Sequence, residues 1–394
     1  MRKIGFIIFL AALAALAPFS TDIYLSSMPL IMHAFSTSIP EMQLTLSLFF
    51  IGYAFAQLFW GPISDRYGRK PVLFIGVIIF LLSSLGCALS HSIGQLIALR
   101  ILQAIGACSG IVMVMSIVKD TFPEPKEMSK VLSIAMGVMI LAPMVAPILG
   151  GYLLVSINWQ ANFYFLFGFG VLVLIGTCFI SESYPQKVRR PLALSQLFGA
   201  YLTQAKKPAF LYAALAAATS FSTMFAFISA SPFVYIKIYH VQPENFGYYF
   251  AINATSLLLG TFSVSWLKRK LSDIQIAYLG GAFSLLGAFI MFVMLFLFAG
   301  SIWSVVIPAC IATYGVGMLF SETVAHALKY VVAYTGLASS VLGTIRFSMA
   351  AVVSYCIGLM IHESAVPLAI TMFVLSGLTL IFMSLHFKVS KKEI

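Results

Sequence analysis

The chain is a succession of long apolar runs separated by short polar segments. Each run is close to the about 20 residues that a helix needs to cross a bilayer. Inside a bilayer only a helix satisfies all of its backbone hydrogen bonds within one segment. The pattern therefore predicts an all-α membrane protein with twelve transmembrane helices, over residues 4–31, 42–60, 72–90, 95–118, 131–154, 160–181, 209–236, 246–266, 274–298, 302–326, 337–360 and 366–387.

The longest polar connection divides these twelve runs into six and six. It predicts an N-terminal six-helix half over residues 1–181, a cytoplasmic linker over 182–208 and a C-terminal six-helix half over 209–394. Paired six-helix halves are a recurring design of secondary transporters, in which the substrate site lies between the halves near the middle of the bilayer.

The middle of the linker has two open interpretations. Its apolar residues repeat at helical spacing, and arginines and lysines flank them, which is typical of an amphipathic helix on the membrane surface. A plain connecting segment fits the composition equally well. The residues concerned are Leu194, Leu197, Phe198, Tyr201 and Leu202.

The positive charges predict the orientation of the chain. Cytoplasmic loops of membrane proteins carry an excess of lysine and arginine. If both termini face the cytoplasm, 20 of the 23 lysines and arginines lie on that side and only Lys237 lies outside. The N-terminus resembles a signal peptide, but its apolar run continues to about Ile31, which favours an uncleaved first helix.

Composition excludes several classes of protein. Hydrophobic residues make up 61% of the chain and charged residues 9%, so a soluble globule could not cover its surface. The net charge of +11 is a topology signal and does not indicate a nucleic-acid partner. The five cysteines lie in apolar stretches without metal-binding spacing, and no catalytic cluster or nucleotide-binding loop is present. We therefore expect that the protein binds no metal, uses no cofactor and is not an enzyme.

Four charged side chains fall within the predicted spans. They are expected to line a pathway or to pair, because a charge in the hydrocarbon is costly. Asp22 and Arg100 both lie in the outer third of the first half, where a movable arginine could control the protonation of the acid; a static pair is the alternative. In the second half, Glu322 and Arg346 are candidates for a second internal pair, while His326 is either a proton carrier or a marker of the cytoplasmic exit.

The fifth run combines small residues with prolines. Ala142, Ala146 and Gly150 repeat every four residues and form a smooth face for close helix packing. Pro143 and Pro147 each remove a backbone hydrogen bond and bend a helix. The segment suits a hinge that slides against a neighbour, although static packing would give the same spacing.

Residues 61–73, Gly-Pro-Ile-Ser-Asp-Arg-Tyr-Gly-Arg-Lys-Pro-Val-Leu, resemble the signature loop of the major facilitator superfamily, with Ile63 at the usual leucine. The resemblance implies a cytoplasmic latch that holds the two halves together. The latch residues are Gly61, Asp65, Arg66, Gly68 and Arg69.

Other motifs narrow the resemblance. Residues 96–104 are similar to the helix-4 motif whose arginine is tied to proton coupling, and that arginine maps onto Arg100. The helix-5 motif of drug:proton antiporters maps onto Pro143, Ala146, Pro147, Gly150 and Gly151, with Ala146 in place of glycine.

Residues 20–25 and 229–250 look like the Bcr/CflA family of bicyclomycin- and chloramphenicol-type efflux proteins, in which an acid of the first helix maps onto Asp22. Glu322 stands where that family more often has asparagine.

These features predict a monomeric exporter of small amphipathic drugs in the bacterial inner membrane, driven by protons. Proton coupling is assigned to Asp22, Arg100 and Glu322. The alternative is a dedicated transporter of one metabolite, such as a chelator or an amino-acid derivative. The expected substrate-binding residues are Asp22, Tyr24, Tyr53, Arg100, Phe225, Tyr235 and Arg346.

Overall fold

The structure is a computed structural model that describes residues 3–184, 199, 203–204, 206–298, 300–329 and 335–393. It confirms twelve helices long and apolar enough to cross a membrane, and the described part contains no strand. The middle of the linker, Leu194 to Leu202, lies outside the described residues, so its two interpretations stay open.

The first half contains seven α-helices because the first span is broken. α1 ends at Asp22, and a short 3-10 turn, η1 (Leu25–Ser27), leads into α2, which completes the span. The α-helices of this half are α1 (Lys3–Asp22), α2 (Met28–Ala34), α3 (Ile39–Tyr67), α4 (Arg69–Ala88), α5 (Ile93–Thr121), α6 (Pro125–Ser156) and α7 (Gln160–Phe179).

The second half repeats this arrangement with its own irregularity. α9 passes directly into a π-helical segment, η3 (Phe233–Ile238), which continues the seventh span past Pro232. The α-helices of this half are α9 (Pro208–Pro232), α10 (Pro243–Leu267), α11 (Asp273–Leu297), α12 (Trp303–Lys329), α13 (Thr335–Met360) and α14 (Val366–Glu393).

Local sequence signals mark where several helices start. The side chain of Ser38 accepts a hydrogen bond from the backbone N–H of Glu41, and the Glu41 carboxylate accepts one from the backbone N–H of Ser38. Ser272 and Gln275 form the same reciprocal cap at the start of α11. Proline occupies the first turn of α3, α6, α9 and α10, where a missing N–H costs nothing.

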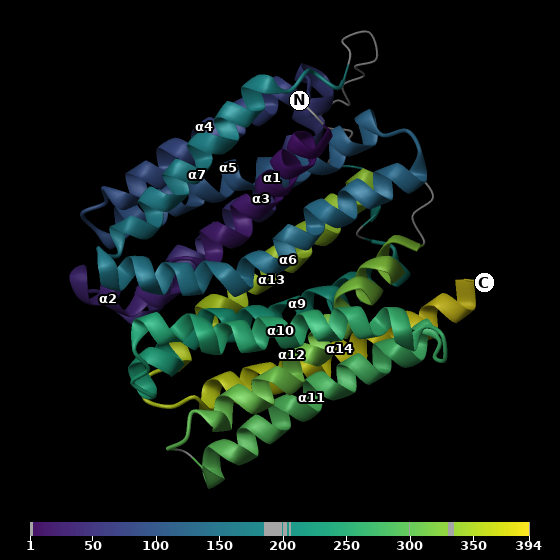
Figure 1. Cartoon of the computed structure of the whole chain (residues 1–394). Helices are drawn as coiled ribbons and strands as arrows, with labels where there is room; N and C mark the ends of the chain where they lie inside the picture. Colours follow the sequence, from purple (N-terminus) through teal and green to yellow (C-terminus); the bar gives the residue numbers. More distant parts are fainter. Residues whose placement is uncertain are drawn as a thin grey trace.

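Figure 1 shows the two halves side by side. Where the halves meet, α6 lies next to α10, and α13 lies next to α9. Both chain ends lie at one end of the bundle, opposite α2. We call the end with the termini the inner end and the opposite one the outer end. The halves touch mainly through two helix pairs, α3 with α13 and α6 with α10.

Small residues allow close helix packing at matching places in the two halves. In the first half, a Cβ on Gly106 of α5 would overlap the backbone of Phe80 in α4. In the second half, a Cβ on Gly287 of α11 would overlap the backbone of Ala312 in α12. These are the third and fourth spans of each half, so the two halves use the same device.

Candidate functional site

Arg100 of α5 is fully buried and holds three helices together at the core of the first half. Its Nη1 donates to the carbonyl of Ser20 at 2.8 Å and to the Oε1 atom of Gln103 at 2.6 Å. Its Nε donates to the carbonyl of Thr45 at 3.4 Å. The guanidinium is therefore bound to α1, α3 and its own helix.

Two aromatic rings cover the same guanidinium. Its central carbon lies 4.4 Å from the ring centre of Tyr24 and 4.3 Å from that of Phe49. Tyr24 is itself fixed, because its hydroxyl shares a 3.0 Å hydrogen bond with Thr45. The structure thus brings together Tyr24 and Arg100, both expected in the substrate site, whereas Phe49 was missed because nothing in its sequence position distinguishes it from a lipid-facing ring.

Asp22 lies at the end of α1, where the first span breaks, and is only 2% exposed. The expected Asp22–Arg100 ion pair is not formed in this structure: among the described residues Asp22 takes part in no ion pair. Carbonyls and Gln103 bind the Nε and Nη1 atoms of Arg100, and its Nη2 atom is buried without a partner among the described residues. The charge of Arg100 still acts on Asp22 through space.

The helix-5 motif lies against this break. Pro143 and Pro147 are inside the continuous helix α6, and Ala146 is fully buried. A Cβ on Gly150 would overlap the carbonyl oxygen of Ile23, the residue directly after Asp22. The absence of a side chain at Gly150 therefore lets α6 contact the backbone beside the buried acid.

The next glycine of the motif contacts the other half. A Cβ on Gly151 would lie 2.6 Å from the carbonyl oxygen of Pro243 and 3.1 Å from the Cα of Glu244, both at the start of α10. In return, a Cβ on Gly247 of α10 would overlap the backbone of Ile148. The motif thus forms a close contact between the halves near the outer end.

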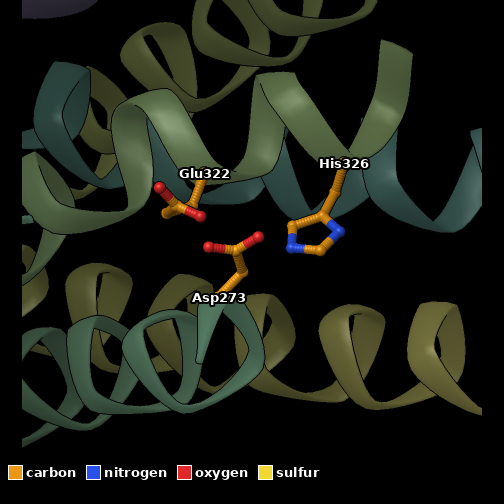
Figure 2. Close-up of side chains that lie close together, drawn as sticks. All are labelled: Asp273, Glu322 and His326. Atoms are coloured by element: carbon orange, nitrogen blue, oxygen red, sulfur yellow. The ribbon is translucent and has the colours of Figure 1, made fainter. Parts of the chain in front are cut away.

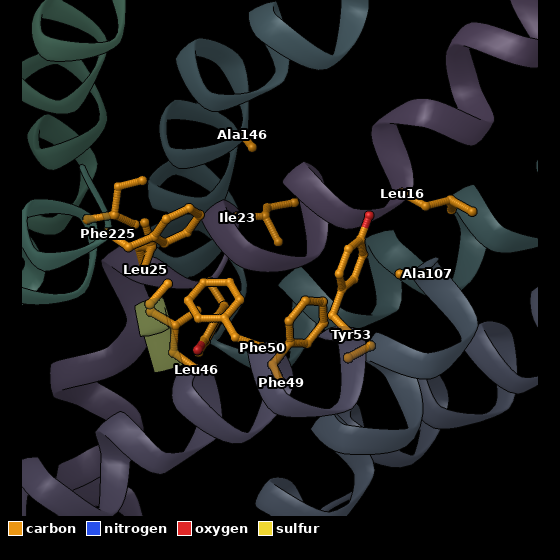
Figure 3. Close-up of a cluster of buried hydrophobic side chains, with 14 of the residues drawn as sticks. Leu16, Ile23, Leu25, Leu46, Phe49, Phe50, Tyr53, Ala107, Ala146 and Phe225 are labelled. Carbon is orange, nitrogen blue, oxygen red and sulfur yellow. The ribbon is translucent and has the colours of Figure 1, made fainter. Parts of the chain in front are cut away.

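An aromatic cluster crosses from α3 to the second half. Ring centres lie 4.5 Å apart for Phe50 with Phe225 and for Tyr53 with Phe347, and 5.1 Å apart for Phe221 with Phe347. Figure 3 shows Phe49, Phe50 and Tyr53 on one helix, with Phe225 beside Phe50. The structure therefore brings together Tyr53 and Phe225, both predicted, with Phe221 and Phe347, which were missed.

Tyr235 does not join this cluster, and its expected role in substrate binding stays a prediction. It is buried in η3 and packs against Phe227, Phe246 and Tyr249. In the described part of the chain, no ring of this group contacts the cross-half cluster. The π-helical turn after Pro232 directs Tyr235 into the second half rather than toward the first.

Arg346 of α13 does not pair with Glu322, so that prediction was wrong. Its guanidinium carbon lies 4.2 Å from the ring centre of Phe221 and 4.9 Å from that of Phe320. Its Nε is buried without a partner. Within the described ranges Arg346 has no ion pair.

Glu322 instead binds a lysine at the inner end of the second half. The Lys268 ammonium lies 2.8 Å from the Glu322 carboxylate and 3.4 Å from that of Asp273. The hydrogen bond that Lys268 donates to Glu322 raises the pKa of Lys268 above its ordinary value of 10.5. Glu322 therefore belongs to a buried-edge ion network and not to the mid-membrane pair predicted for it.

The same network includes His326 of α12. Figure 2 shows Asp273 between Glu322 and His326, and their ligand atoms lie within 4.8 Å of one another. Such a set could hold a metal ion, but the ammonium of Lys268 already binds both carboxylates. A second cation would have to displace it against electrostatic repulsion.

The latch residues form a corresponding network in the first half. Arg69 binds Asp65 at 2.6 Å and Asp120 at 2.9 Å, and its backbone N–H donates to Glu182 at 2.9 Å. Asp65 and Asp120 belong to the first half, and Glu182 is the first residue of the linker that follows it. In this conformation Arg69 therefore ties the inner ends of α3, α4 and α5 to the segment after α7, and a latch between the halves stays a prediction.

The two glycines of the latch have different environments. Gly68 is the turn, with φ of 101°, a value that glycine adopts readily. Gly61, expected in the turn, lies inside α3, which continues to Tyr67, and a Cβ there would meet nothing within 4 Å. Arg66 is exposed and stacks on Tyr67 at 5.3 Å.

Both halves thus place a basic residue of the turn after their second span against an acid near the inner end of their fourth span. Arg69 with Asp120 and Lys268 with Glu322 are the two pairs. The sequence did carry a signal for these two pairs, because each half has a basic turn that is followed by an acid at a similar spacing. The aromatic partners of Arg346 had no such signal.

Comparison with known proteins agrees with this architecture. The family model described as "Major Facilitator Superfamily" matches residues 10–354. A bicyclomycin resistance protein homolog of Haemophilus influenzae is 33% identical over 368 residues, which cover 93% of this chain and 92% of that protein. The multidrug resistance protein MdtL of Klebsiella pneumoniae is 37% identical over 175 residues, 44% of each chain.

Solved structures share the fold at low identity. The xylose transporter XylE from E. coli, in a partially occluded inward open conformation, superposes with a TM-score of 0.75 at 12% identity and covers 98% of this chain and 97% of its own. A bacterial homolog of the human lysosomal transporter Spinster gives a TM-score of 0.73 at 18% identity, covering 99% and 98%. Two six-helix halves of this kind are therefore the shared fold.

Proposed function

Because this chain belongs to the Major Facilitator Superfamily, we propose that it exports small amphipathic drugs from bacteria in exchange for protons. It would act as a monomer in the inner membrane, with both termini in the cytoplasm, by alternating access and without a cofactor. The names of the relatives, a bicyclomycin resistance protein homolog and a multidrug resistance protein, support drugs as the substrate class. The twelve spans support a multi-pass membrane location.

The observation that carries the proton coupling is the position of Asp22. A buried carboxyl group stands at the break of the first span, next to the backbone that Gly150 touches. An intramembrane acid usually faces a pathway and carries protons or substrate. Any sliding of α6 against the break would move the surroundings of this acid.

Arg100 supplies the second part of the mechanism. Its hydrogen bonds hold it beside Asp22 without an ion pair. Approach of the guanidinium favours the charged carboxylate, and separation or entry of substrate favours the protonated acid. A cycle that alternates these arrangements moves a proton inward while substrate moves outward.

The contacts between the halves support substrate entry from the inner side in this conformation. The side-chain nitrogen of Gln43 donates to the carbonyl of Ser229 at 2.6 Å, near the outer ends of α3 and α9. Thr344 donates to the carbonyl of Ala54 at 3.2 Å, nearer the middle. Together with the contact of Gly151 on Pro243, these bonds close the outer end.

The proposal is tested with purified protein in liposomes, over a panel of amphipathic drugs and with an imposed pH gradient. We expect transport that follows the gradient and proton release when substrate binds. Asp22→Asn should abolish both and keep the protein folded, since asparagine preserves shape and cannot titrate. Glu363→Gln removes an exposed acid of an outer loop and is the matched control.

The competing static role of Asp22 makes a different prediction. If Asp22 only orients helices, Asp22→Asn should lower the melting temperature and spare proton release in the fraction that folds. Wild-type proton release from a stable Asp22→Asn variant would remove Asp22 as the proton carrier. Transport of no panel compound under any gradient would remove the drug-export proposal.

The dedicated metabolite transporter is the second candidate. It is favoured by Glu322, which stands where the Bcr/CflA family more often has asparagine; in the structure Glu322 binds Lys268. A deletion strain separates the two functions: drug sensitivity indicates export of drugs, and a changed metabolite pool indicates the dedicated transporter.

A further inference from the structure

Arg346 is a charged side chain near the middle of a span without a protein acceptor. It lies 14 residues before the outer end of α13 at Met360, or roughly 21 Å at the rise of an α-helix. Among the described residues, no hydrogen-bond acceptor or carboxylate binds its guanidinium, and its Nε is buried and unpartnered. Within the described ranges its guanidinium packs against the faces of Phe221 and Phe320.

Comparison with Arg100 shows that this state is unusual within the same molecule. Arg100 donates to two backbone carbonyls and a glutamine and is fully buried. Arg346 is half-buried and makes none of these bonds. Arg100 thus binds the protein through two of its three guanidinium nitrogens, and its Nη2 atom is buried without a partner. In the described part of the chain no protein acceptor binds any of the three nitrogens of Arg346, which leaves its donors available for a ligand.

From this contrast we propose that Arg346 binds an anionic or strongly hydrogen-bond-accepting group of the substrate, and that the transporter discriminates against cations. The inference rests on the proposed export function and names its substrate class. A guanidinium offers five donors in a planar fork that matches a carboxylate. Stacking between two phenyl rings holds that plane in place and leaves its edge free.

The surroundings of Arg346 suit the rest of such a molecule. Phe221 continues through Phe347 to Tyr53 of the first half, with ring centres 5.1 Å and 4.5 Å apart. These flat apolar surfaces can stack against an aromatic body beside the bound acceptor. A compound held here would contact both halves at once.

The charges around the cross-half cluster favour the same class. Arg346 and Arg100 lie at its two ends, on Phe221 and Phe49. Asp22 is the acid near Arg100, and Glu322 is bound to Lys268 at the inner end. A cation next to Arg346 would therefore meet an uncompensated positive charge, whereas an anion would neutralise it.

The test compares three ring-matched probes on purified full-length protein: biphenyl-4-carboxylate, biphenyl-4-carboxamide and biphenyl-4-ylmethylammonium. We expect the wild type to bind the carboxylate and the carboxamide at least about tenfold more tightly than the ammonium, the scale of one hydrogen bond to a charged group. Arg346→Gln should weaken carboxylate binding at least about tenfold and change ammonium binding less than about twofold.

Two further variants control this result. Lys270→Gln removes one positive charge from the turn after α10, where Lys270 stacks on Trp266, and should keep the wild-type preference. Arg346→Lys keeps the charge and loses the planar fork, so a weaker preference for the carboxylate should remain. If Arg346→Gln shows no cooperative melting transition, the preference of Arg346→Lys tests the inference in its place.

Several outcomes overturn the inference. For the wild type, these are binding of the ammonium probe as tight as or tighter than binding of the carboxylate, or no binding of any probe. For the variants, they are equal weakening of the binding of all three probes by Arg346→Gln, or complete loss of the preference for the carboxylate in a folded Arg346→Lys variant. Failure of proton-driven export is measured separately in liposomes. A preference that persists without gradient-driven transport would keep this inference and refute the coupling.

Discussion

The contact of Gly151 with Pro243 predicts that one added methyl group will open the outer end. In Gly151→Ala the new Cβ would stand 2.6 Å from the Pro243 carbonyl oxygen and 3.1 Å from the Glu244 Cα. Both are backbone atoms at the start of α10, so neither can rotate away as a side chain would. α6 and α10 must separate for the methyl group to fit.

The magnitude follows from two opposing effects. Alanine in place of glycine inside a helix stabilises it by about 0.5–1 kcal/mol, whereas overpacking costs about 1–3 kcal/mol. Gly137→Ala is the matched control, because Gly137 lies in the same helix and its Cβ would meet nothing within 4 Å. The difference between the two variants isolates the contact, at about 1–3 kcal/mol or roughly a 5- to 150-fold shift in a two-state equilibrium.

The assay measures access to the outer end directly. Ser229 is buried, and its carbonyl accepts the cross-half hydrogen bond from Gln43. A single cysteine at Ser229, in a background without the five native cysteines, is labelled from outside with a membrane-impermeant maleimide. Gly151→Ala should accelerate labelling relative to Gly137→Ala by a factor in this range. Equal rates and equal melting temperatures in the two variants would refute the reasoning.

Three other predictions follow from the charged networks and the topology. Asp65→Asn should reduce transport without preventing insertion, and it should change the free energy of unfolding by about 1 kcal/mol or less, because Asp65 is 45% exposed in its pair with Arg69. Asp120→Asn, at 15% exposure, should cost more, about 1–3 kcal/mol; equal costs in denaturant titrations would contradict this ranking. The hydrogen bond to Glu322 raises the pKa of Lys268 above 10.5, so the pair stabilises the protein at neutral pH and loses this effect as the pH rises through the raised pKa. Above pH 10.5 the melting temperature should therefore fall more steeply with pH for the wild type than for Glu322→Gln. An equal fall in both proteins would be inconsistent with the pair. A periplasm-active reporter inserted at Gly300–Ile302 or His362–Ser364 should be active and one fused after Lys392 silent, and activity after Lys392 would rule out an even number of spans.

Prediction from sequence was most reliable where the cause is local. The start of α3 follows from the reciprocal cap of Ser38 and Glu41, and its end follows from Gly68 with positive φ. The break after Asp22 was not expected, because residues 4–31 form one apolar run. In the structure, Pro29 stands in the first turn of α2 just after the break, and Gly150 of another helix closely approaches Ile23 at the break.

The substrate-binding role of the candidate residues stays a prediction, although the structure does bring several of them together. Tyr24 contacts Arg100, and Tyr53 and Phe225 lie in the cross-half cluster. In the described part of the chain, neither Asp22 with Arg100 nor Glu322 with Arg346 forms an ion pair: backbone carbonyls bind Arg100, and Lys268 binds Glu322. These partners come from other segments of the chain, and hydropathy carries no information about them.

The sequence alone determined the number of spans, their predicted orientation and the family motifs. Length and apolarity decide whether a segment crosses the membrane, because each helix satisfies its own backbone hydrogen bonds. The tertiary structure decided which side chains meet. Each residue turns an α-helix by about 100°, so a small rotation of α12 or α13 changes which neighbour Glu322 or Arg346 faces. That rotation is set by packing, in particular by glycine contacts such as Gly287 on Ala312, and not by the pattern within any one helix.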